Sequence, residues 1–187
     1  MLLCGIIDEL EKSAQTHHLS YFFCQATHSR INNATAVLRG LLYLLVAQQP
    51  SLISHVQKEY NHAGKAIFDD SKAWFALSDM FTNILQDKDL NSAYLIIDAL
   101  DECVTDLPKL LDFIVKQSSA SPRVKWIVSS RNWPHIEKKL KTAAQGVWLR
   151  LELNESSISA AVTSYIQAKV DQLAGENKYD DDTRDTV

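Results

Sequence analysis

The sequence is poor in glycine and contains no phosphate-binding loop of the form G-x-x-x-x-G-K-[ST]. It has five glycines among 187 residues and a single Gly-Lys pair, Gly64-Lys65. The residue after this pair is Ala66 instead of Ser or Thr, and Glu59 stands where the motif needs its first glycine. We also expect the pair to lie in a helical region rather than after a strand, so we interpret it as a chance match.

Cysteine is equally scarce, and the sequence lacks the patterns that bind metals or support nucleophilic catalysis. Cys4, Cys24 and Cys103 are far apart and odd in number, with no C-x-x-C pair. The six histidines show neither H-E-x-x-H nor mixed Cys/His spacing, and no G-x-S-x-G segment occurs. These absences argue against a disulfide framework, a zinc site and a serine hydrolase, and they favour a reduced, cytoplasmic location.

Long apolar runs and blocks of like charge are also missing. The apolar segment Leu41–Ala47 is far shorter than the roughly 20 residues that cross a bilayer. The first ten residues carry no basic start and include Asp8 and Glu9, unlike a signal peptide. Lysine and arginine total 19 against 23 acidic residues, a net charge of −4, which disfavours electrostatic binding to nucleic acid. We therefore expect a soluble protein that binds neither nucleic acid nor membranes.

What the sequence does contain is an alternation of short apolar segments with segments of helical spacing. The apolar segments are hydrophobic throughout, as in strands that are buried on both faces of a parallel sheet. We expect three such strands, over Leu19–Gln25, Ser92–Asp98 and Val124–Ser129, and a last strand over Val147–Leu153, where apolar residues alternate. Apolar residues three and four apart predict helices over Met1–Ala14, Ala34–Gln48, Ser51–Tyr60, Ser71–Gln86, Leu107–Gln117, Pro134–Ala143 and Ser156–Leu173.

This order of elements predicts an α/β fold with a doubly wound, mostly parallel sheet and helices on both faces. The helices between residues 51 and 86 form a helical insertion in that fold. With 46% hydrophobic and 22% charged residues, the chain suffices for one sizeable core. We expect one domain over residues 1–173 and a polar tail over residues 174–187 that begins a following segment.

Polar side chains follow two of the predicted strands directly. Asp98 ends one strand, with Asp101 and Glu102 three and four residues later, and Ser130 and Arg131 follow the next strand. Because ligands bind at the carboxyl ends of parallel strands, we expect these residues to share one crevice. An acid that holds Mg²⁺ there, with a further acid to orient a water molecule, is the Walker B arrangement of P-loop nucleoside triphosphatases. Arg131 would then face the terminal phosphate.

Simpler interpretations of the same residues stay open at this point. An apolar strand that ends in an acid is common in α/β proteins, whatever they bind. Asp101 and Glu102 are also suited to the first turn of a helix, where acids complement the helix dipole. Arg131 is equally suited to a surface ion pair with Glu102 or Glu137.

Four segments stand out in combination: YFFC at Tyr21–Cys24, VLRGLL at Val37–Leu42, YLIIDALDEC at Tyr94–Cys103 and VKWIVSSRNWP at Val124–Pro134. Together they resemble the NACHT domain of fungal STAND proteins, the group of vegetative-incompatibility proteins and NOD-like receptors. The same region is also described as a nephrocystin-like N-terminal domain. The resemblance implies an ATP- or GTP-operated switch with Mg²⁺, which oligomerises through like domains and triggers an effector in non-self recognition and programmed cell death.

The resemblance also implies roles for individual residues. By position, Asp98 would bind Mg²⁺, Asp101 and Glu102 would be the catalytic acids, and Ser130 and Arg131 would contact the nucleotide. Hydrolysis by this chain is left open, because the G-x-x-x-x-G-K-[ST] loop that holds the phosphates does not occur in it.

In P-loop proteins the phosphate-binding loop leads directly into a helix, and this sequence opens with an uncapped helix. We therefore expect the loop and the first strand of the fold to be encoded immediately before Met1. The leading hypothesis is a truncated switch module without autonomous hydrolysis. The alternatives are a non-catalytic interaction protein that pairs with related full-length receptors and, more weakly, a P-loop kinase or helicase-related ATPase. The charge of −4 argues against a helicase.

Overall fold

The computed structural model describes residues 2–13, 17–64, 73–90, 92–119, 121–143 and 163–172. Contacts between residues divide the chain into two units, Met1–Gly146 and Val147–Val187, a boundary that falls inside the predicted domain 1–173. In the second unit, residues 163–172 form a helix, as predicted there. The predicted strand Val147–Leu153 and the tail 174–187 lie outside the described residues. Within the described ranges, no helix has both the length and the apolar character needed to cross a bilayer.

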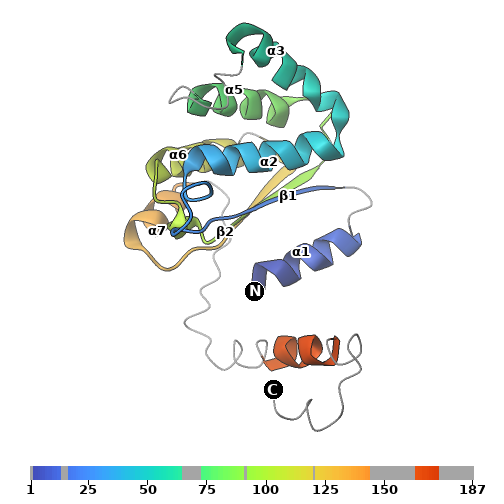
Figure 1. Ribbon diagram of the computed structural model, residues 1–187, viewed down its shortest axis with the longest axis vertical. Coiled ribbons are helices and arrows are strands. Elements are labelled where there is room, and N and C mark those ends of the chain that lie inside the picture. The colour runs from blue at the N-terminus through green and yellow to red at the C-terminus, as the bar shows by residue number, and fades with distance from the viewer. Residues whose placement is uncertain are drawn as a thin grey trace. The chain divides into compact units, whose positions relative to one another are not determined.

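A parallel sheet of three strands forms the centre of the first unit (Figure 1). Strands β1 (His18–Phe23), β2 (Ala93–Asp98) and β3 (Val124–Val128) are adjacent in that order, which confirms the predicted α/β class and three of the predicted strands. The register pairs Phe23 with Asp98, and Ile97 with Val128. All three strands therefore end at the same edge, and β1 ends two residues earlier than predicted because Cys24 and Gln25 enter the following loop.

One face of the sheet is covered by α2 (Ala34–Gln48), α5 (Ala73–Gln86) and α6 (Leu107–Ser118). The side chain of Asn33 caps α2 by accepting a hydrogen bond from the Ala36 N–H group at 2.8 Å. Each fully buried apolar side chain in this core contributes about 1.5–3 kcal/mol. The largest of them include Leu38, Leu41, Leu45, Leu77, Met80, Phe81, Ile84, Leu85 and Leu95.

The predicted helical insertion is present between β1 and β2. A 3₁₀ turn, η1 (Pro50–Leu52), precedes α3 (Ile53–Ala63), so this helix begins two residues later than predicted. Helix α3 lies against α5, which lies against α2, as Figure 1 shows. After β3 the chain forms the short helix α7 (Pro134–Leu140), three residues shorter than predicted because residues 141–143 leave the helix as a turn and a bend.

The opposite face of the sheet carries α1 (Leu2–Ser13), which packs through a second small core. This core consists of Leu3, Ile7, Leu19 and Ile96. Helices therefore cover both faces, as predicted. Both connections between the described strands pass over the α2 side, so the described strand order advances in one direction. The reversal of direction that defines a doubly wound sheet is not part of the described strands.

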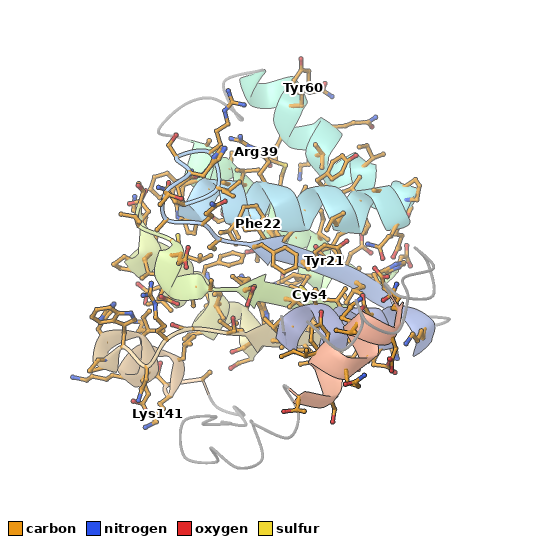
Figure 2. All side chains as sticks on the ribbon, turned by 60° about the horizontal axis from the view of Figure 1, so that its bottom comes forward. Cys4, Tyr21, Phe22, Arg39, Tyr60 and Lys141 are labelled. Atoms are coloured by element: carbon orange, nitrogen blue, oxygen red, sulfur yellow. The ribbon has the colours of Figure 1, made fainter. Side chains whose placement is uncertain are left out.

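The direction of α1 matters for the site. Four residues, 14–17, separate the end of α1 from the beginning of β1, and such a short connection makes the helix antiparallel to the strand that it packs on. The first turn of α1 therefore lies toward the edge where the strands end, as can be followed in Figure 1. On the other face, Phe22 of β1 lies beside α2 (Figure 2).

Candidate functional site

The turn that follows β2 is the centre of the candidate site. Ala99 has a left-handed backbone, with φ = 51°, and the next three residues form the 3₁₀ turn η2 (Leu100–Glu102). This conformation is rare for a residue with a Cβ atom and costs about 1–2 kcal/mol. The turn is tied to the end of β3, because the Ala99 N–H group donates to Ser129 Oγ at 2.9 Å and the Leu100 N–H group donates to the Ser129 carbonyl at 2.9 Å.

Asp98 lies on the face of the sheet that α1 covers. Side chains alternate along a strand, and Ile96, two residues earlier, packs against α1. The hydroxyl group of Ser129 donates to Asp98 Oδ1 at 2.5 Å. Within the described residues, Asp98 Oδ2 accepts no hydrogen bond. The Asp98 carboxylate is thus oriented by one neighbour, and one of its oxygens is available at the edge to which the first turn of α1 points.

Asp101 turns toward β3 and binds Arg131. Its Oδ1 accepts a hydrogen bond from the Arg131 main-chain N–H group at 3.0 Å, and its Oδ2 accepts one from Arg131 Nε at 2.6 Å. The Asp101 side chain is 3% exposed, whereas that of Arg131 is 70% exposed. Burial alone would raise the pKa of Asp101, but the two hydrogen bonds and the charge of Arg131 outweigh it and lower the pKa. The same ion pair raises the pKa of Arg131.

Glu102 turns the other way, toward the loop that follows β1. Its Oε2 accepts a hydrogen bond from the Ala26 N–H group at 3.0 Å. The far end of this loop is bound by main-chain bonds, because the Asn32 carbonyl accepts from the N–H groups of Val104 at 2.7 Å and Thr105 at 3.1 Å. The loop after β1 is therefore attached to the turn after β2 at both of its ends.

The structure thus brings Asp98, Asp101, Glu102 and Arg131 together at one edge of the sheet. Arg131 pairs with Asp101, and not with Glu102 or Glu137 as the simpler interpretation of the sequence allowed. Ser130 is exposed, and its hydroxyl group donates to the Arg131 carbonyl at 2.8 Å. The roles of these residues toward a nucleotide remain predictions.

Three partners in the site had little or no signal in the sequence. The Ser129 hydroxyl was predicted at the end of a strand, but its bond to Asp98 depends on how β2 and β3 are aligned. The Ala26 N–H group and the Asn32 carbonyl belong to the main chain. No side-chain pattern marks them, and only the tertiary fold makes them part of the site.

Asp98 is the residue at this edge that could hold a divalent cation. No group of three His, Cys, Asp or Glu side chains that could hold a metal occurs in the part of the chain that the structure describes. Mg²⁺ is usually bound by one or two carboxylates, with water and phosphate oxygens as its remaining ligands. Asp98, with the Ser129 hydroxyl beside it, matches that pattern, because it offers one hard carboxylate oxygen.

Comparison with known proteins shows the family to which this chain belongs. The sequence model of the family "Nephrocystin 3, N-terminal" matches residues 1–131, and the chain belongs to this family. It is 63% identical over 180 residues to Vegetative incompatibility protein HET-E-1 of Podospora anserina. This match covers 96% of the chain but 13% of the length of HET-E-1, so the chain corresponds to a small part of that protein. No solved structure matches the chain.

Proposed function

We propose that this chain is a truncated part of a nucleotide-operated switch of the NACHT type, and that the complete switch binds ATP or GTP with Mg²⁺ in the cytoplasm. The observation that carries the proposal is the position of Asp98. Its carboxylate ends the central strand, is oriented by Ser129, and lies on the side of the sheet that α1 covers. The first turn of α1 points to the same edge, and the N-terminus of a helix attracts phosphate through its N–H groups and dipole.

The chemistry of such a site follows from its charges. When bound, Mg²⁺ would neutralise the phosphate charge and bridge the phosphates to the protein. Asp98 would hold the ion directly or through water, and the Ser129 hydroxyl would fix the direction of the carboxylate. Ser130 and Arg131, which follow β3, would lie beside the terminal phosphate. Arg131 is suited to this position, because its guanidinium group is largely exposed and already anchored by Asp101.

The biological setting is proposed from the relative. HET-E-1 is named a vegetative incompatibility protein. We propose that the protein containing this chain acts in fungal non-self recognition and triggers programmed cell death after oligomerisation through like domains.

The first test is the genomic sequence immediately before Met1, where an in-frame G-x-x-x-x-G-K-[ST] preceded by an apolar strand is expected. The second is calorimetry with Mg-ATP and Mg-GTP. The chain alone is expected to show no measurable binding at millimolar ligand concentration. A chain extended by the upstream sequence is expected to bind, and Asp98→Ala to weaken its binding about tenfold or more, as for the loss of a charged contact.

Asp112→Ala is the matched control for this experiment. Asp112 is an exposed acid on α6 that pairs with Lys139, so its removal is expected to leave nucleotide binding unchanged. Equal binding by the Asp98→Ala protein would contradict the assignment of Asp98. No binding by the extended chain would favour the alternative of a non-catalytic protein that pairs with related receptors.

A further inference from the structure

Asp101 and Glu102 are bonded to the two loops on either side of the turn that carries them. We propose that they are positioning residues: they form a two-armed clasp that holds the loop after β1 and the loop after β3 in fixed places around Asp98. This inference rests on the proposed function, because it concerns how the surroundings of the proposed Mg²⁺ site are organised.

The Asp101 arm is bonded to Arg131 through both carboxylate oxygens. Each of its two oxygens already accepts one hydrogen bond from that residue, one from the main chain and one from the side chain. With 3% of its side chain exposed, Asp101 is buried at this contact. The main-chain bond fixes the path of the loop that leaves β3, and the side-chain bond fixes the direction of the exposed guanidinium group. Asp101 therefore determines where Arg131 can reach.

The Glu102 arm holds the other loop across 76 residues of sequence. Its bond to the Ala26 N–H group fixes the start of the loop, whereas the Asn32 carbonyl fixes its end through main-chain bonds. Between these two attachments, residues 27–30 are exposed and include His28 and Arg30. Glu102 is thus a side-chain attachment, from the turn after β2, of a segment that carries His28 and Arg30 at the same edge as Asp98.

Asp98, Asp101 and Glu102 have different roles because their carboxylates point in different directions. Asp98 bonds to Ser129, which is part of the sheet edge itself. Asp101 accepts hydrogen bonds from the loop after β3, and Glu102 accepts one from the loop after β1. A change at Asp98 that moves the turn after β2 would therefore move both loops together, and with them Arg30 and Arg131. The clasp couples the central strand to the two segments that border the proposed nucleotide crevice.

Amide hydrogen exchange, measured by NMR without nucleotide, tests the clasp in the chain as it is. Glu102→Ala is expected to speed exchange of the Ala26 amide about tenfold or more, the ratio for losing a hydrogen bond to a charged group, and to leave the Arg131 amide within about twofold. Asp101→Ala is expected to do the reverse. Glu102→Gln keeps an acceptor oxygen, so it is expected to restore most of the protection of Ala26.

The pattern separates the clasp from a general loss of structure. If Asp101→Ala speeds exchange at Ala26 as much as Glu102→Ala does, or if the Ile96 amide in β2 is affected equally, the two arms are not independent and the proposal is wrong. It is also wrong if the Ala26 amide is unchanged by Glu102→Ala, or if Glu102→Gln exchanges as fast as Glu102→Ala. Because nucleotide is not used, failure of the proposed function would leave these results unaffected.

Discussion

A methyl group added at Gly40 in the middle of α2 would collide with the ring of Phe22 in β1. A Cβ atom built there would lie 2.4 Å from Phe22 Cδ2 and 2.8 Å from Phe22 Cε2, whereas carbon atoms in contact are about 3.5–4.0 Å apart. The ring would have to move by about 1 Å or more, or α2 would have to withdraw from the sheet. Overpacking of this kind costs about 1–3 kcal/mol, against about 1 kcal/mol gained when alanine replaces glycine inside a helix. We expect Gly40→Ala to lower the free energy of unfolding by about 0–2 kcal/mol.

Gly5 provides a matched control, because it also lies inside a helix. A Cβ atom added at Gly5 in α1 meets nothing within 4 Å, so Gly5→Ala is expected to stabilise the protein by about 0.5–1 kcal/mol through the helix alone. The difference between the two substitutions isolates the clash, at about 1–3 kcal/mol. In a Phe22→Ala background, where the ring is gone, Gly40→Ala is expected to stabilise like Gly5→Ala.

Urea unfolding followed by circular dichroism and tryptophan fluorescence measures these differences, provided that the m-value is unchanged. The reasoning is refuted if Gly40→Ala stabilises the parent protein as much as Gly5→Ala does. It is also refuted if the interaction energy between positions 22 and 40 in the double-mutant cycle is below about 0.5 kcal/mol, the usual error of additivity. Either result would mean that an alanine side chain at position 40 does not collide with the ring of Phe22.

Two further predictions concern groups with shifted pKa values. Because Arg131 lowers the pKa of Asp101, this pair stabilises the fold above the unfolded-state pKa of 3.8 and ceases to do so as pH falls through the lower folded-state value. The stability difference between the parent protein and Arg131→Met, from urea unfolding, is expected to be constant from pH 5 to 7 and to shrink below about pH 4. Burial raises the pKa of Cys24 and Cys103 to about 12, so both thiols are expected to resist alkylation at pH 8 until the protein unfolds, and stability is expected to fall as pH rises above about 9. Mass spectrometry after timed alkylation checks this, with half-exposed Cys4 as the reactive reference.

The strands and most helices were predictable because their signals are local. Strand β2 is apolar up to its last residue, Asp98, as burial on both faces requires, and its length limits it to a strand. Pro50 ends α2 at the predicted residue, since proline cannot continue the hydrogen bonding of the helix. The predicted end of β1 was less accurate, because nothing in the residues Cys24 and Gln25 marks the point where the chain leaves the sheet.

The members of the site were predictable, but their partners were not. Asp98 and Arg131 each follow an apolar strand, and parallel strands end at one edge, so their proximity follows from the pattern. The ion-pair partner of Arg131 does not follow from the pattern, because Asp101, Glu102 and Glu137 are all acids that could reach it. Which acid binds it depends on the path of the turn after β2, and so on the left-handed backbone of Ala99.

The turn after β2 also explains why the side chains of Asp98, Asp101 and Glu102 point in three different directions. In the first turn of an ordinary helix, residues three and four positions after Asp98 would lie on one face, close to each other and to the strand end. Here Ala99 reverses the backbone and η2 is a tight 3₁₀ turn, in which side chains are spaced by about 120°. Asp101 therefore reaches the loop after β3, Glu102 reaches the loop after β1, and Asp98 stays on the face toward α1. The strain at Ala99 is offset by the two bonds to Ser129, so the geometry that separates the acids depends on the same serine that orients Asp98.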